Sequence, residues 1–196
     1  MAILALFACS VDATRRPPER KFGYLTASLD AESFTGTFGP DSTVAVYNSD
    51  IGQLQIEGNR RGHSWWEVVR LTMVCQKAPN QGAYHISTPF FTPVSAEVHR
   101  THIRRWLPRQ WRTTNHSFIS DSITPGILRL DTLDLKSGAI SGSFHVRVRT
   151  IDQKPVDSLF VTGVFTGRVR PSSFRSIRSV RFSPEMGRDC KSAKSQ

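Results

Sequence analysis

Regular alternation of apolar and polar residues within residues 138–167 is the feature that most limits how this chain can fold. Every second position across 140–148 is apolar or glycine, and the positions between are serine, histidine or arginine. A period of two is typical of a strand with one buried face and one wet face. After a short polar loop the chain continues with Ser-Leu-Phe-Val-Thr-Gly-Val-Phe-Thr-Gly at 158–167. The two segments therefore predict a closing hairpin, with Phe144 and Phe165 in the core.

Similar short patterns recur through the chain between turn residues such as Gly39-Pro40-Asp41. The other predicted strands are 24–29, 33–38, 43–47, 54–57, 65–76, 83–86, 95–99 and 127–133. Strands separated by frequent turns predict an all-β fold, a single antiparallel β-sandwich or barrel-like meander of about eight to ten strands. Sandwich and closed barrel stay open as alternatives. Alternation weakens over 87–120, where we expect loops or insertions.

Most of the positive charge is predicted to lie outside this β domain, which is expected to span 22–170. The formal net charge is +10. The linker 10–21 and the tail 171–196 are basic, whereas 22–167 holds fourteen basic and twelve acidic residues. The tail is rich in serine and arginine, and it is expected to be disordered because it has too little apolar surface to fold alone.

Residues 1–9 indicate a location. They form an apolar run that ends in Ala8-Cys9 and is followed at once by a polar segment. This is typical of the end of a truncated lipoprotein signal segment, in which Cys9 would be acylated. We expect the true start to lie upstream and to supply basic residues. The alternative is an ordinary hydrophobic start packed on the domain.

A series of short motifs resembles a known family. The motifs are Cys9, Leu-Thr-Ala-Ser-Leu-Asp-Ala-Glu-Ser-Phe-Thr-Gly at 25–36, Gly82-Ala83-Tyr84, Gly126-x-Leu128-x-Leu130, Ile140-Ser141-Gly142-Ser143-Phe144 and Val161-Thr162-Gly163-Val164-Phe165. In order and spacing they are similar to the small, uncharacterised β-rich lipoproteins common in Bacteroidota. The likeness covers about 22–167, with Ala31 where the family commonly has glycine. It implies a β domain in the cell envelope and no particular activity.

Cysteine and histidine positions do not predict a metal site. No Cys-x-x-Cys pair occurs. Cys75 lies in register with the apolar positions of its strand and is predicted to be a buried free thiol, while Cys190 could cross-link opportunistically. His99 and His102 are three residues apart, which on a strand places them on opposite faces, and they are expected to be surface residues like His116.

Catalytic motifs are also lacking. Gly62-His63-Ser64 matches half of a nucleophile elbow, but Trp66 stands where glycine is needed and a strand is expected to follow. The sequence contains no HExxH zinc motif, phosphate-cradling glycine loop or Rossmann fingerprint. No catalytic residue, cofactor or metal is predicted.

One segment combines arginine and tryptophan without any acid. Its candidate contact residues are Arg100, Arg104, Arg105, Trp106, Arg109, Trp111 and Arg112. Positive charge beside aromatic surfaces is typical of single-strand nucleic-acid binding. The same residues also suit an anionic membrane or glycan, and a solvated loop is the favoured interpretation.

The sequence therefore predicts a non-enzymatic, lipid-anchored cell-envelope protein, periplasmic or at the outer membrane, with a β-sandwich binding or scaffold domain. Expected partners are the membrane, through the lipid, and a glycan or an envelope protein. Nucleic acid is a less favoured partner. The alternative function is a soluble polyanion- or nucleic-acid-binding protein that uses residues 99–112.

Overall fold

The structure is a computed structural model that describes residues 23–30, 32–36, 43–75, 77–88, 93–107, 110–150, 157–172 and 190, without the side chains of 43, 105–107, 110 and 111. Within these residues the chain forms eleven β-strands and no helix. They are β1 Tyr24–Leu29, β2 Glu32–Gly36, β3 Thr43–Asn48, β4 Gln53–Arg61, β5 Trp65–Val74, β6 Gly82–Ile86, β7 Val94–Leu107, β8 Gln110–Ser120, β9 Gly126–Asp134, β10 Ala139–Thr150 and β11 Ser158–Ser172.

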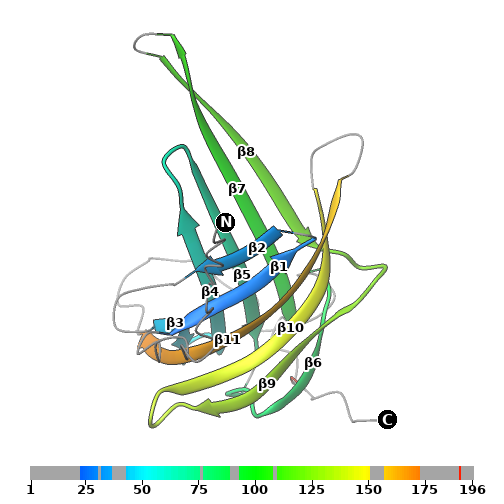
Figure 1. The fold of residues 1–196 in the computed structure, drawn as a ribbon. Coiled ribbons are helices and arrows are strands. Elements are labelled where there is room, and N and C mark those ends of the chain that lie inside the picture. The colour runs from blue at the N-terminus through cyan, green and yellow to red at the C-terminus, as the bar shows by residue number, and fades with distance from the viewer. Residues whose placement is uncertain are drawn as a thin grey trace, which may run out of the picture.

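All eleven strands belong to one sheet, which closes partly into a ring. The strand order is β2-β1-β11-β3-β4-β5-β7-β8-β10-β9-β6, and an additional β10–β11 pairing joins two distant members of that order. The pairs are antiparallel except β11–β3, which is parallel. In Figure 1, β1, β11, β10 and β9 cross in front of the steeper strands β4, β5 and β7. The all-β, barrel-like prediction is confirmed.

Strands β10 and β11 form the hairpin that the alternation predicted. They pair from Ala139↔Arg168 to Arg149↔Ser158. Gly142 lies opposite Phe165, and Phe144 lies opposite Gly163. A Cβ atom added to Gly163 would lie 2.6 Å from the Thr26 carbonyl oxygen and 2.7 Å from the Phe144 ring. The two rings therefore occupy the space that the two glycines leave open.

The core lies inside the ring and is built from alternate residues of its strands. Phe144 and Phe165 are 2% and 1% exposed, which confirms them as core residues. The largest fully buried side chains are Phe34, Phe165, Leu25, Leu29, Leu54, Ile56, Leu71, Met73, Ile86, Leu128, Leu130 and Val44. On the outer face of β10, His145 is exposed while Arg147 and Arg149 are half-buried. No helix in the described part is long and apolar enough to cross a membrane.

Short turns connect β1 to β2 and β9 to β10. Asp30, between β1 and β2, has a φ of 54°, and its backbone N–H donates to the Phe160 carbonyl at 2.9 Å. At the β9–β10 turn, Asp134 Oδ1 accepts from the backbone N–H of Lys136 at 2.8 Å and of Ser137 at 3.3 Å. A hydrogen bond from the Ser137 hydroxyl, followed by these two backbone bonds, lowers the pKa of Asp134. Gly138 closes the turn with a φ of 75°.

Three boundaries differ from the prediction. Loops or insertions were expected over 87–120 apart from a strand at 95–99, but β7 and β8 form a long hairpin there. The turn expected at 58–62 begins later, because β4 continues to Arg61. The final strand runs past Pro171 to Ser172, where it pairs with β3. The described strands number eleven rather than about eight to ten.

Cys75 is not a free thiol, which corrects the prediction for this residue. It forms a disulfide with Cys190, with a Cα–Cα distance of 5.4 Å and a sequence separation of 115. Cys75 is 1% exposed and follows β5, so the bond attaches residue 190 to the edge of the core. The segments 1–9 with Cys9, 10–21 and most of 171–196 lie outside the described residues.

Candidate functional site

The β7–β8 hairpin positions the candidate site. β7 pairs with β5 from Val94 to His102, while β8 pairs with β10 at Phe118–Ser120. Beyond these contacts the two strands continue together, and Figure 1 shows them rising past the other labelled strands. The inner face of the hairpin, whose lower half packs into the core, is therefore carried beyond the core.

The chemistry of this inner face changes row by row along the hairpin. A row here is a set of residues that pair across neighbouring strands. The deepest of these rows is buried and consists of Gly58, Val69, Val98 and Phe118. The next row outward is charged and consists of Arg60, Glu67, Arg100 and His116. The rows beyond it contain Trp65, His102 and Thr114, and then Arg104 opposite Arg112. The apolar core thus gives way to a cationic surface within three rows.

Glu67 organises the charged row. It is 4% exposed, and both of its carboxylate oxygens accept from arginine. Arg60 Nε donates to Oε2 at 2.7 Å, and Arg100 Nε donates to Oε1 at 2.5 Å. Arg100 also lies 3.6 Å from the exposed Glu32 carboxylate. This row forms the floor of the site, and both of its guanidiniums are bonded to carboxylates of the protein.

Aromatic rings hold one of these arginines in place. The Arg60 guanidinium lies 5.2 Å from the centroid of the Phe34 ring and 4.9 Å from that of the Trp65 ring. Its Nη1 also donates to the Ser33 carbonyl at 2.7 Å. Cation–π contacts and hydrogen bonds together hold the guanidinium at this position in the floor of the site.

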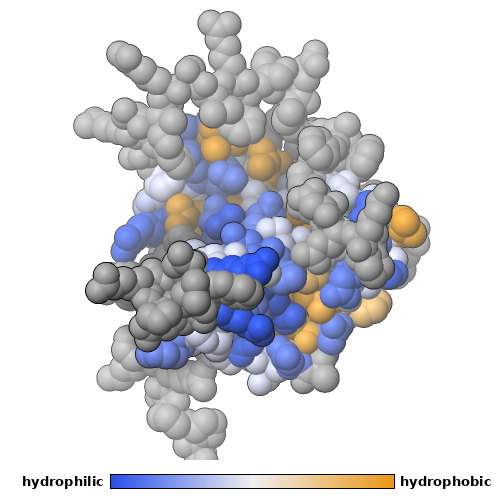
Figure 2. Space-filling model, turned by 90° about the horizontal axis from the view of Figure 1, so that it is seen from above, coloured by the Kyte–Doolittle hydropathy of each residue, from blue (hydrophilic) through white to orange (hydrophobic). Residues whose placement is uncertain are grey.

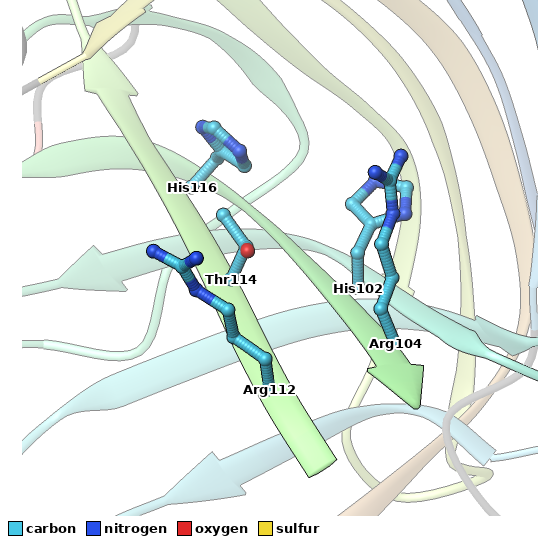
Figure 3. Close-up of a pocket in the computed structure, with 5 residues that line it drawn as sticks. All are labelled: His102, Arg104, Arg112, Thr114 and His116. Atoms are coloured by element: carbon cyan, nitrogen blue, oxygen red, sulfur yellow. The ribbon is translucent and has the colours of Figure 1, made fainter. Parts of the chain in front are cut away.

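Above this floor lies a groove of about 410 Å³ lined by His102, Arg104, Arg112, Thr114 and His116. Figure 3 shows the five side chains projecting from the same side of two adjacent strands. From above, this end of the molecule presents strongly hydrophilic residues near its centre (Figure 2). The five residues supply guanidinium, imidazole and hydroxyl donors but no carboxylate. The groove is chemically suited to an anion.

Arg104 and Arg112 lie directly opposite each other in the β7–β8 ladder. Cβ atoms of such a pair are typically about 4.5–5.5 Å apart, and like charges in this position are destabilising. The chain between Glu97 and Asp121 contains no acidic residue. The hairpin therefore concentrates positive charge at one place.

The outer face of the same strands carries an ion-pair network instead. Arg70 Nε donates to Glu57 Oε2 at 2.7 Å, and its Nη1 lies 3.5 Å from Glu97 Oε2. His99 bonds Ser117 Oγ at 3.1 Å and Glu97 Oε2 at 3.2 Å. The hydrogen bond from His99, followed by the charge of Arg70, outweighs burial and lowers the pKa of Glu97. This face is internally satisfied, so it is a weaker candidate for binding.

The structure separates the predicted contact residues into three groups. Arg104 and Arg112 line the groove, whereas Arg100 belongs to the floor. Arg105 and Trp111 are opposite each other in the ladder, and their side chains, like that of Trp106, lie outside the description. Arg109 and the lipidation candidate Cys9 lie outside the described residues altogether.

Five residues of the site were missing from the predicted set, namely Arg60, Glu67, His102, Thr114 and His116. The sequence signal that could have found three of them is the spacing of two between Arg100, His102 and Arg104 and between Arg112, Thr114 and His116. Their placement confirms that His99 and His102 face opposite sides of the strand. No group of three potential metal ligands occurs among the described residues.

The fold and groove define an all-β, partly closed barrel with a cationic mouth. Comparisons with protein-family models, curated proteins and solved structures found no match for this chain.

Proposed function

We propose that this protein is a non-enzymatic, lipid-anchored protein of the cell envelope, and that its β domain binds an anionic ligand. The observation that carries the binding part is the groove formed by His102, Arg104, Arg112, Thr114 and His116. Its donors project from one face of the hairpin, next to a floor whose two arginines are bonded to carboxylates. A concave site with convergent polar groups is the usual form of a ligand site.

The disulfide supports the location part of the proposal. Disulfides persist in oxidising compartments such as the periplasm and the cell surface, and they are rare in the cytosol. Cys75–Cys190 joins a core position to the far end of the chain. An envelope location agrees with the acylation pattern that ends at Cys9. The membrane is then the partner of the anchor, and a glycan or envelope protein remains the proposed further contact.

Heparin affinity chromatography tests the binding part. Heparin is a sulfated polyanion, so the wild-type protein should be retained at low salt and released as salt screens the interaction. The variant R104Q/R112Q should elute at clearly lower salt. The matched control is R129Q/R168Q, which removes two exposed arginines from β9 and β11. Equal shifts in the two variants would show that net charge, not the groove, causes retention, and this would overturn the proposal.

Labelling with palmitate tests the anchor. Cells that express the full-length gene should incorporate labelled palmitate into the protein, and C9A should abolish this incorporation. C190S is the control, because it removes another cysteine without touching the acylation pattern. Incorporation that persists in C9A would reject the anchor at this residue.

A soluble polyanion- or nucleic-acid-binding protein is the second candidate. Residues 99–120 contain five arginines and three histidines without an acid, which favours contact with a phosphate backbone. Retention on single-stranded DNA that requires Arg104 and Arg112, in a protein that takes up no palmitate, would support this function over the envelope proposal.

A further inference from the structure

We infer that the outer edge of β8 is a docking site for an acidic, extended segment of a partner protein, which adds to the sheet as a further strand. This inference goes beyond the proposed function, because it uses the backbone of β8 and not the side chains that line the groove. It depends on the pairing of β8, on the direction of its backbone groups, and on the charge of the hairpin.

Only the lower part of β8 has a neighbouring strand on each side. On one side, β7 pairs with β8 along the whole hairpin. On the other side, β10 pairs only with residues 118–120, and the last pair is Thr150↔Phe118. Among the strands that the structure describes, none pairs with this outer edge of β8 between Thr113 and Ser117. Figure 1 shows the same part of the hairpin rising past the other labelled strands.

A backbone hydrogen bond identifies the residues that face this edge. Just after β8, the Asp121 N–H donates to the Arg147 carbonyl of β10 at 2.9 Å. In a regular strand the backbone groups of successive residues point to opposite sides, so every second residue faces the same neighbour. Counted back from Asp121 in steps of two, the N–H and C=O groups of Thr113, Asn115 and Ser117 face the open edge. They form a row of donors and acceptors about 13 Å long.

This edge lacks features by which proteins commonly protect an exposed strand. Residues 112–117 contain neither proline nor lysine, and the ladder with β7 has no bulge over 112–119. Thr113 and Asn115 are exposed, and Ser117 is half-buried. A regular, open edge is a template for β-augmentation, in which main-chain hydrogen bonds to an extended segment provide the affinity.

The charge of the hairpin favours an acidic segment as the occupant. Residues 98–120 include five arginines and no acid. Arg100 is bonded to Glu67, whereas Arg104 is exposed and forms no ion pair with a described residue. A second copy of this chain would bring the same cations to the edge, and juxtaposed like charges oppose such pairing. A segment with acidic residues at alternate positions would present them along one face of the added strand.

Fluorescence anisotropy with the labelled peptide Thr-Glu-Val-Glu-Val-Glu-Thr and the full chain tests the inference. The wild-type protein should bind this peptide, and it should not bind a peptide with lysine in place of each glutamate. N115P removes an N–H that faces the open edge and none that pairs with β7, so it should weaken binding about tenfold or more. N115A keeps that N–H and should bind within about twofold of the wild type, because the main chain provides the affinity.

A change in the peptide backbone gives a test that does not depend on the folding of a variant. N-methylation at the glutamates removes the N–H groups on one edge of the bound peptide, and N-methylation at the valines removes groups on the other edge. One of the two methylated peptides should lose about tenfold or more in affinity and the other should keep it, because an added strand pairs through one edge. Equal affinities of the two methylated peptides would overturn the inference.

Two results with the protein variant would also overturn it. One is equal affinity of N115P and the wild type for the acidic peptide, with thermal unfolding curves that show both proteins folded. The other is a wild-type dimer that N115P converts to a monomer in size-exclusion chromatography, because a second copy would then occupy the edge. N115P leaves Arg104 and Arg112 in place, so either result would leave the heparin test of the groove unaffected.

Discussion

Arg100 donates a 2.5 Å hydrogen bond from Nε to Oε1 of Glu67, across the ladder between β5 and β7. Glu67 is buried, and Arg60 occupies its other oxygen. We expect E67A to lower the free energy of unfolding by about 1–3 kcal/mol, because two half-buried guanidiniums lose their acceptor. Urea denaturation of both proteins at neutral pH measures the difference.

The control for this substitution is E32A. Glu32 also contacts Arg100, at 3.6 Å, but its side chain is 71% exposed. An exposed ion pair contributes little, so E32A should change the unfolding free energy by no more than about 0.5 kcal/mol. Losses of similar size in the two variants would contradict the view that Glu67 organises the floor of the groove.

The disulfide should be a major source of stability. Cys75 and Cys190 enclose a long loop, with a sequence separation of 115. Linking distant residues restricts the unfolded chain, so C190S should lower the unfolding free energy by about 2–4 kcal/mol relative to the oxidised wild type. Under reducing conditions the two proteins should unfold together. Rapid alkylation of both cysteines in the native, unreduced protein would show that the bond is not formed.

Space beside Gly163 is filled by its cross-strand neighbour. A Cβ atom there would lie 2.6 Å from the Thr26 carbonyl oxygen and 2.7 Å from the Phe144 ring. We therefore expect G163A to destabilise the protein by about 1–3 kcal/mol through overpacking. T162A, on the exposed face of the same strand, is the matched control and should stay within about 0.5 kcal/mol. If G163A left the free energy of unfolding unchanged, β10 and β11 would be able to move apart at no cost in stability.

Glu97 should contribute to the acid sensitivity of the fold. The hydrogen bond from His99, and then the charge of Arg70, lower the pKa of Glu97 in the folded protein. A carboxyl whose pKa falls on folding adds stability above its unfolded pKa, and this stability disappears as the pH drops through the folded pKa. E97Q should therefore lose less stability than the wild type between about pH 5 and pH 3.

Unfolding free energies at a series of pH values would test the Glu97 prediction. At neutral pH, E97Q should be less stable than the wild type, and the two curves should converge as the pH falls. The exposed Asp131, which pairs with Arg129, supplies the control D131N. If the curves of unfolding free energy against pH were parallel for the wild type and E97Q, the ionisation of Glu97 would make no contribution to the stability of the fold.

Most strands were predictable because one face of each is apolar. The alternation around Phe144 is complete, and the structure places the residue in the core as expected. Upper β7 and β8 escaped prediction for the opposite reason. Arg100, His102 and Arg104 point inward, and the alternate positions, such as Thr101, point outward. Because polar residues occur on both faces, the hydropathy of the segment shows no period of two.

The candidate site was partly predictable for a related reason. Arg104 and Arg112 stood out through charge and the absence of acids, but their opposition across a ladder depends on the register of a hairpin that the sequence did not indicate. Glu67 and Arg60 come from β5 and β4, far from the hairpin in sequence. The partner of Cys75 was equally hidden, since a cysteine at residue 190 carries no local signal of which thiol it meets.

Strand β11 holds the ring together, because it pairs with β10, β1 and β3 along its length. It is also the last strand in the described chain, so the ring cannot close until Ser158–Ser172 have been synthesised. Pairings between such distant segments predict slow folding. A shortened chain that stops before Ser158 would keep open edges on β1, β3 and β10, and open strand edges are the surfaces through which β proteins aggregate.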